Sequence, residues 1–308
     1  MKYYMAPMEG ITGYIFRNAC HKYLYHMDKY FTPFITPTQT RKFKTREVED
    51  VLPEHNQDMY VVPQILTNKA DDFIWAAREL EKMGYREINL NLGCPSGTVV
   101  AKKKGSGFLA DQEQLDIFFG QVFSQLDMKI SVKTRIGKDS PDEFQGLMEI
   151  YNKYPFEEVI IHPRIQKDFY NNHPDLQTFQ WAYENSLHPL CYNGDIRTGD
   201  DYKSISEAFP NLKAVMIGRG ILRSPGLMGE ITGQKEIEKK TVKAWHDEIC
   251  KGYCQIFSGD RNVLFKMKEI WFYLMPLFSG KEGLERKLKK AKTLTEYQSV
   301  VEMIFESK

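Results

Sequence analysis

Short apolar runs alternate with amphipathic stretches over roughly the first 220 residues of the chain. Eight runs are rich in β-branched and aromatic residues and are predicted as strands: 3–6, 30–35, 60–65, 87–91, 129–133, 159–162, 190–193 and 214–217. Several are apolar at successive positions, which is typical of parallel strands buried on both faces. Pro33 weakens the second prediction, because proline cannot donate to a sheet ladder.

Apolar residues recur at helical spacing between these strands, over 68–83, 111–126, 141–154 and 198–209. Eight strands alternating with helices predict an α/β fold, the (β/α)8 TIM barrel. A doubly wound sheet is the alternative, and it usually carries a glycine-rich turn after its first strand. Here the first strand is followed by Pro7-Met8-Glu9-Gly10, which favours the barrel.

The pattern becomes helical after about residue 235, with helices predicted over 241–258, 260–275, 283–291 and 294–307. The segment 234–240 is rich in Lys and Glu and is the expected boundary. The sequence therefore predicts a barrel domain over 1–236 and a small helical domain over 237–308.

Composition and charge narrow the functional classes. Hydrophobic residues make up 42% of the 308 residues and charged residues 27%, which excludes a disordered chain. The 42 Lys and Arg nearly balance 41 Asp and Glu, so bulk charge does not indicate nucleic-acid binding. No signal peptide or membrane-spanning stretch is recognised, and we expect a cytoplasmic monomer without a membrane contact. The five scattered cysteines predict neither a disulfide framework nor a metal site.

Polar residues and glycines stand where the predicted strands end, which is where barrels place their functional groups. Gly194 follows the seventh strand and Gly218-Arg219-Gly220 the eighth, and both suit a phosphate cradle. Gln64, Lys133 and Asn193 suit the polar edge of a flavin ring. Lys133 would also stabilise negative charge on a reduced flavin.

Two further residues carry candidate chemistry. Cys94 lies between Gly93 and Pro95 on a predicted loop, outside any hydrophobic run, and its thiol can donate a proton. His162 ends the sixth strand close to Arg164, where it can donate to a flavin or contact a substrate phosphate.

Seven motifs occur in an order that resembles the dihydrouridine synthases, the flavin enzymes that reduce uridine in tRNA. They are Ala6-Pro7-Met8-Glu9-Gly10, Asn89-Leu90-Asn91-Leu92-Gly93-Cys94-Pro95, Lys102 to Gly107, Val132-Lys133-Thr134-Arg135-Ile136-Gly137, Ile161-His162-Pro163-Arg164, Asn193-Gly194-Asp195-Ile196 and Met216-Ile217-Gly218-Arg219-Gly220.

The resemblance implies FMN as cofactor, NADPH as reductant and tRNA as partner. The implied FMN-binding residues are Pro7, Met8, Glu9, Gln64, Lys133, His162, Asn193, Gly194, Asp195, Gly218 and Arg219. Hydride would pass from reduced FMN to C6 of uracil, while Cys94 protonates C5. The implied substrate and RNA contacts are Asn91, Lys102, Lys103, Lys104, Arg135 and Arg164, together with basic residues of the C-terminal helices.

The chain departs from the family pattern at two places. Pro163-Arg164-Ile165 replaces a frequent Gly-Arg-Thr, and Glu9 stands where a small residue is common. The alternatives are ribosomal RNA as the substrate, another FMN barrel acting on a small molecule, and an RNA-binding barrel without catalysis. The predicted helical domain over 237–308 and the lysine loop, the segment that carries Lys102, Lys103 and Lys104, favour RNA. The presence of Cys94 favours catalysis. The sequence leaves open which uridine is modified and whether NADPH or NADH is used.

Overall fold

The computed structural model describes residues 1–306 and contains one parallel sheet. Its strands are β1 Lys2–Met5, β2 Lys29–Phe31, β3 Val61–Val62, β4 Gln64–Ile65, β5 Glu87–Leu92, β6 Lys129–Gly137, β7 Glu158–Ile165, β8 Leu190–Tyr192 and β9 Ala214–Ile217. Their spatial order is β3-β2-β1-β9-β8-β7-β6-β5-β4.

Pro63 explains why nine segments make an eight-stranded barrel. It separates β3 from β4, and it has no N–H with which to continue the ladder. The strand predicted over 60–65 is therefore split in two, with β3 paired to β2 and β4 paired to β5. Since β3 and β4 are the two ends of the spatial order, their continuity closes the sheet. The predicted (β/α)8 barrel is confirmed.

The observed strands differ from the predicted ones mainly in length. β6 continues to Gly137 and β7 to Ile165, well beyond the apolar runs that predicted them. The strand predicted over 30–35 ends at Phe31, and Ile35 forms only an isolated bridge with Ile65.

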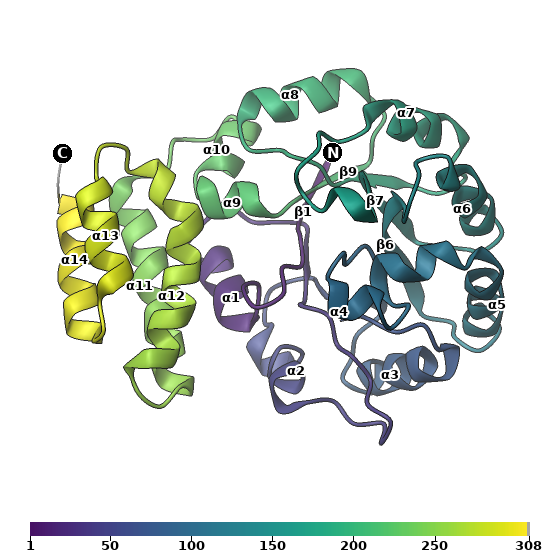
Figure 1. Ribbon diagram of the computed structural model, residues 1–308, viewed down its shortest axis with the longest axis horizontal. Coiled ribbons are helices and arrows are strands. Elements are labelled where there is room, and N and C mark those ends of the chain that lie inside the picture. Colours follow the sequence, from purple (N-terminus) through teal and green to yellow (C-terminus); the bar gives the residue numbers. More distant parts are fainter. Residues whose placement is uncertain (307–308) are drawn as a thin grey trace. The chain divides into compact units, whose positions relative to one another are not determined.

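Helices α3 (Ala70–Lys82), α5 (Gln112–Phe123), α6 (Glu143–Asn152) and α7 (Leu176–Asn185) lie around the outside of the strands (Figure 1). The first three were predicted, whereas α7 was not. Each of α5 and α7 begins at an aspartate, Asp111 or Asp175, whose side chain accepts a backbone N–H of the first turn. Shorter helical turns join the strands: α2 Thr45–Glu49, η1 Pro53–His55, α4 Gly97–Val100, η2 Gly105–Ala110 and η3 Gln166–Asp168.

The residues buried among the strands divide into an apolar and a polar group. The apolar cluster comprises Tyr4, Ala6, Phe31, Val62, Ile160, Cys191, Ala214 and Met216, from β1, β2, β3, β7, β8 and β9 and the residue after β1. β4, β5 and β6 contribute Gln64, Glu87, Asn89, Asn91 and Ser131, each no more than 7% exposed. Buried polar groups must be satisfied within the protein, so this half of the barrel holds a hydrogen-bond network.

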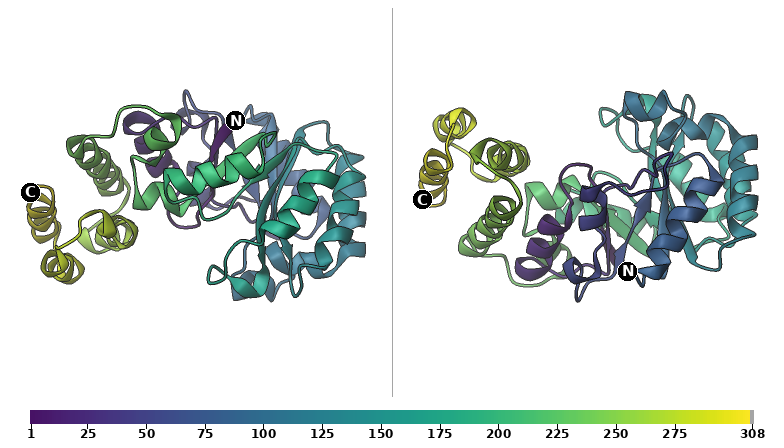
Figure 2. Two further views of the ribbon diagram at one scale, coloured as in Figure 1. Left: turned by 90° about the horizontal axis from the view of Figure 1, so that it is seen from above. Right: turned by 90° about the horizontal axis from the view of Figure 1, so that it is seen from below.

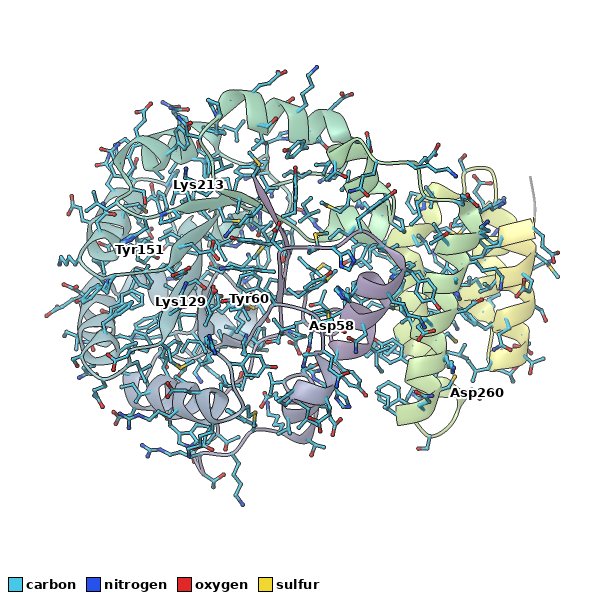
Figure 3. The ribbon with its side chains drawn as sticks, turned by 180° about the vertical axis from the view of Figure 1, so that it is seen from behind. Asp58, Tyr60, Lys129, Tyr151, Lys213 and Asp260 are labelled. Atoms are coloured by element: carbon cyan, nitrogen blue, oxygen red, sulfur yellow. The ribbon has the colours of Figure 1, made fainter. Side chains whose placement is uncertain are left out.

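An ionic cluster lies at the end of the barrel where the strands begin. The Lys29 ammonium is 2.9 Å from both carboxylate oxygens of Glu87 and 2.8 Å from one oxygen of Glu158. Tyr4 and Tyr60 donate their hydroxyls to Glu158 and Glu87. Figure 3 labels Tyr60, one of the two tyrosines of this cluster.

Contacts divide the chain into two compact units. The first comprises residues 1–7, 28–195 and 205–217, and the second comprises 8–27, 196–204 and the chain from 218 onward. Helix α8 (Gly199–Ala208) belongs in part to each. The second unit contains α1 Tyr14–Tyr23, α9 Arg219–Arg223, α10 Leu227–Thr232, α11 Lys239–Ile256, α12 Asp260–Leu274, η4 Met275–Leu277, α13 Glu282–Lys290 and α14 Leu294–Glu306. The domain boundary at residue 237 stays a prediction.

The second unit is held by aromatic packing between α1 and the C-terminal helices. Trp245 of α11 is fully buried, donates its indole N–H to the Cys20 sulfur at 3.3 Å, and packs edge-on against Phe16. Figure 2 shows α11 to α14 as neighbouring helices, as the sequence predicts. Within residues 1–306, none of the helices combines the length and apolar composition needed to cross a membrane.

Candidate active site

Cys94 lies just beyond the end of β5, on a loop whose backbone is fixed on both sides. Its N–H donates to the Asn91 side-chain oxygen at 2.9 Å, and its carbonyl accepts from the Ser106 hydroxyl at 2.8 Å. Gly105 has a φ of +55°, and a Cβ there would lie 2.8 Å from the Cys94 carbonyl oxygen. Only glycine therefore allows the following segment to pack this closely against the cysteine. Cys94 is intermediate in exposure, so reagents and substrates can reach it.

Lys133 of β6 lies near the Cys94 thiol and has no counter-charge. Its ammonium makes no hydrogen bond or ion pair with any of the residues 1–306. Burial and the neighbouring Arg135 guanidinium lower the pKa of Lys133 to about 8, although Cys191 and Cys94 oppose this shift. Lys133 is half-buried. A largely desolvated cation without an anion is costly, and an anionic ligand would remove that cost.

His162 and Arg164 of β7 form a connected group with Asp195. The Arg164 guanidinium is 1% exposed and makes two hydrogen bonds to the Asp195 carboxylate, at 2.5 and 3.2 Å. It also lies 2.8 Å from His162 Nε2. Because arginine can only donate, Nε2 must accept and the neutral imidazole carries its proton on Nδ1. Arg164 thus sets the tautomer of His162.

Arg135 connects the loops at this end of the barrel. Its guanidinium is 0% exposed and donates to the carbonyls of Gly93, Ile165 and Phe169 at 3.0, 2.9 and 2.7 Å. The geometry favours a role in holding these loops together over the RNA contact expected from the sequence. The same applies to Arg164, whose guanidinium is committed to Asp195, His162 and the Asn172 carbonyl.

The amides expected to contact a flavin are already hydrogen-bonded within the protein. Gln64 donates to Asn89 and accepts from Asn91, each at 2.7 Å. Asn193 donates to the Met216 carbonyl at 2.8 Å. A Cβ on Gly194 would lie 2.0 Å from the Tyr192 hydroxyl, so a side chain there would require the Tyr192 ring to move.

These residues lie where the parallel strands of the barrel end. Comparison with known proteins identifies the family that carries this set of residues. A family model described as dihydrouridine synthase matches residues 4–307. The chain belongs to the dihydrouridine synthase family. The match spans the barrel strands and the C-terminal helices, so the resemblance expected from the motifs is confirmed.

Individual members of the family are distant in sequence but similar in length. A probable tRNA-dihydrouridine synthase of Staphylococcus aureus is 29% identical over 311 residues, covering 97% of this chain and 91% of its own. The tRNA-dihydrouridine synthase B of Pasteurella multocida is 25% identical over 279 residues, covering 88% and 83%.

Two solved structures share the fold. A variant of NCR from Zymomonas mobilis superposes with a TM-score of 0.53 at 13% identity, covering 79% of this chain and 90% of that one. Morphinone reductase in complex with tetrahydroNAD gives 0.53 at 11% identity, covering 78% and 89%. At these identities the similarity shows the barrel architecture alone.

Four of the residues that resemblance to dihydrouridine synthases assigns to FMN belong to the second unit. Met8 and Glu9 follow β1 by three and four residues, and Gly218 and Arg219 come directly after β9. Pro7 ends a segment of the first unit. The structure thus groups Gln64, Lys133, His162, Asn193, Gly194 and Asp195 with Cys94 in the first unit.

The lysine loop of this dihydrouridine synthase is exposed. Lys102 and Lys103 are open to solvent, and Lys104 is half-buried. Burial lowers the pKa of Lys104; Asp72 opposes this shift, and Lys102, Lys69 and Lys44 add to it. The four lysines therefore form one basic cluster, although they come from separate segments of the chain.

Sequence reasoning missed Lys69 in this cluster and Tyr170 near His162. The Tyr170 ring is half exposed, with its centroid 6.0 Å from that of His162 and 5.4 Å from the Arg135 guanidinium carbon. A tyrosine among charged residues was the signal that could have identified Tyr170. The predicted strand ended at residue 162, so the sequence did not indicate where the segment containing Tyr170 would lie. Across residues 1–306, no three His, Cys, Asp or Glu side chains gather closely enough to hold a metal ion.

The lowered pKa of Lys133 predicts a pH-dependent stability difference. Below about pH 8 the folded protein holds a charged, unpaired ammonium, so Lys133→Met should stabilise flavin-free protein by at most about 3 kcal/mol. Between about pH 8 and 10.5 the unfolded chain binds the proton and the folded one does not, so the advantage should shrink. Urea unfolding of both proteins from pH 7 to 10.5 measures this. A difference that stays constant with pH would contradict it.

Proposed function

We propose that this dihydrouridine synthase uses FMN and NADPH to reduce uridine to 5,6-dihydrouridine in tRNA, acting as a cytoplasmic monomer. The observation that carries the proposal is the fixed Cys94 loop beside the unpaired Lys133, at the strand ends of a barrel from this family. The names of the relatives support tRNA as the substrate.

The donor set of the first unit fits FMN. A flavin presents carbonyl and nitrogen acceptors on one edge and accumulates negative charge there when reduced, and Lys133 supplies an unpaired cation for it. His162 presents Nδ1–H as a donor because Arg164 occupies Nε2. The residues that would hold the cofactor are Pro7, Met8, Glu9, Gln64, Lys133, His162, Asn193, Gly194, Asp195, Gly218 and Arg219.

Reduced FMN, when bound, supplies a hydride to C6 of the uracil ring. Cys94 then donates its thiol proton to C5, which forms the second C–H bond and leaves a thiolate. Lys133 stabilises that thiolate electrostatically until water returns the proton. Asn91 and Ser106 hold the Cys94 backbone so that the thiol stays directed at the ring.

The exposed lysines suit the RNA. A base in folded tRNA is stacked, so it must leave the stack to reach Cys94. The cluster of Lys44, Lys69, Lys102 and Lys104 would bind phosphates flanking that base. Arg286, Lys287, Lys289 and Lys290 of α13 are exposed and would add a second contact.

The direct test is mass spectrometry of RNA incubated with the purified protein and NADPH. Unmodified tRNA and ribosomal RNA are supplied separately. Dihydrouridine in the tRNA supports the proposal, and dihydrouridine in ribosomal RNA alone would assign the alternative substrate. Flavin-bearing protein that modifies neither RNA would contradict the proposal in favour of a small-molecule reductase.

Lys133→Met should lower both the FMN content of the purified protein and the rate of flavin reduction by NADPH. Losing one buried charged interaction corresponds to roughly a tenfold effect or more. Flavin absorbance and stopped-flow bleaching measure the two quantities. Lys138→Met, a change of a partly exposed lysine on the following loop, is the control and should retain both. Equal behaviour of the two variants would argue against Lys133 as a flavin contact.

A further inference from the structure

A continuous chain of side-chain hydrogen bonds runs down the polar half of the barrel from the Cys94 loop. The N–H groups of Gly93 and Cys94 both donate to the side-chain oxygen of Asn91, at 3.0 and 2.9 Å. Asn91 donates its amide nitrogen to the Gln64 oxygen at 2.7 Å, and Gln64 donates in turn to Asn89 at 2.7 Å. Three amides thus follow one another away from the cysteine.

The chain ends at the ionic cluster. Asn89 donates its amide nitrogen to the Ser131 hydroxyl oxygen at 3.0 Å, and that hydroxyl donates to Glu87 at 3.2 Å. Glu87 is held by Lys29 at 2.9 Å. Each of the residues in this row, from Asn91 to Lys29, is at most 8% exposed, so water cannot substitute for a missing partner.

The strand register produces this arrangement. Glu87, Asn89 and Asn91 alternate along β5, and alternate residues of a strand share one face. Asn89 is in register with Gln64 of β4 on one side and with Ser131 of β6 on the other. Hydrogen bonds across and along the strands therefore connect the two ends of the barrel.

Glu87 fixes the donor-to-acceptor direction along this row of hydrogen bonds. An ionised Glu87 can only accept, and the Ser131 hydroxyl donates toward it at 3.2 Å, with the Ile88 carbonyl at 3.4 Å as a second acceptor. The Ser131 oxygen then offers a lone pair to Asn89. The Asn89 nitrogen is then fixed toward Ser131 and its oxygen toward Gln64, and the same reasoning fixes Gln64 and Asn91. At the upper end, the Asn91 oxygen must face the two N–H groups of the Cys94 loop. A reversed amide would set donor against donor in a buried site.

We propose that Ser131, Asn89 and Gln64 are positioning residues, which transmit the fixed orientation of Glu87 to Asn91 and so hold the Cys94 thiol in place. The inference rests on the proposed role of Cys94 as proton donor. The proposal assigns Gln64 a structural role, because its amide nitrogen donates to Asn89 and its amide oxygen accepts from Asn91.

Ser131→Ala tests the proposal because it breaks the chain between Asn89 and Glu87 without changing a residue near Cys94. Tyr151→Phe is the matched control. It removes another fully buried hydroxyl, on α6, and the hydrogen-bond partner of that hydroxyl, Thr134, does not belong to the row of hydrogen bonds between Asn91 and Lys29. In Figure 3, Tyr151 is labelled at a different place from Tyr60, which belongs to the ionic cluster. Ser131→Thr restores the hydroxyl and should restore the wild-type properties.

The first readout is the pH profile of Cys94 alkylation by iodoacetamide, followed by peptide mass spectrometry. It needs neither flavin nor RNA, so it remains informative if the protein does not reduce uridine. Ser131→Ala should shift the profile or change the rate several-fold, whereas Tyr151→Phe should not. Wild-type alkylation in Ser131→Ala, or an equal change in both variants, would overturn the proposal.

The second readout separates positioning from a general loss of structure. Ser131→Ala should slow the reaction of reduced enzyme with RNA about tenfold, because small displacements of a reacting group are costly. Its loss of stability in urea should match that of Tyr151→Phe, because each change removes one buried hydroxyl. A larger loss of stability in Ser131→Ala, parallel to the loss of activity, would show a structural effect alone and would contradict the positioning role.

Discussion

Replacing Cys94 by alanine is expected to abolish most dihydrouridine formation while leaving flavin content and RNA affinity intact. A positioned proton donor contributes roughly 10²–10⁴-fold to a rate, so the product rate should fall by about that factor. The loop itself should persist, because its hydrogen bonds to Asn91 and Ser106 use backbone atoms of residue 94. Mass spectrometry of the RNA, flavin absorbance and a filter-binding assay measure the three properties.

Cys254→Ala is the control for this experiment. Cys254 is exposed on α11 and should be dispensable for the reaction. If Cys94→Ala forms dihydrouridine as fast as Cys254→Ala does, Cys94 is not the proton donor. If it loses its flavin, the defect lies in folding or cofactor binding instead.

Lys29→Met is expected to destabilise the protein by about 3–5 kcal/mol, because it leaves two buried carboxylates without their cation. Burial disfavours the charge on Lys29, but Glu158 and Glu87 outweigh this effect and raise its pKa. Burial also raises the pKa of Glu158 despite the opposing influence of Lys29. Urea unfolding measures the loss of stability.

The destabilisation of Lys29→Met should shrink as the pH falls from 8 toward 5. Without the ammonium, the pKa of Glu158 should rise further above its value in the unfolded chain. The folded state then binds more protons and gains stability on acidification. Lys129→Met is the control at the same end of the barrel. Its ion pair with Glu157 is exposed, so this change should cost at most about 1 kcal/mol. An equal loss of stability in the two variants would show that the buried cluster contributes no more to stability than an exposed ion pair.

The barrel could be predicted from the sequence because its signals are local. β-branched runs such as 159–162 and amphipathic stretches such as 68–83 depend on nearest neighbours, and both appear where expected. Helices α1 and α7 were not predicted, although each has ten residues, like the predicted α6. α1 packs against α11, which lies far along the chain. Trp245, for example, lies 225 positions from the Cys20 that it contacts.

The candidate site was predictable in composition but not in geometry. Cys94 and Lys133 could be selected because polar residues at the ends of barrel strands are unusual without a function. No pattern in the sequence indicated that Arg135 would be buried against three carbonyls, or that Arg164 would bind Asp195. The type and position of a charged residue in the sequence are the same whether its side chain points into solvent or packs against neighbouring loops.

By itself, the sequence determined the fold class, the family and the candidate chemical groups, since each depends on residue type and order along the chain. The tertiary structure decided which groups are committed to internal partners and which are not. Strand register brings Gln64, Asn89 and Ser131 into one row, and the fold places no counter-charge against the half-buried Lys133. These properties arise from contacts between residues far apart in the chain, where water has been excluded and every polar group must find its partner within the protein.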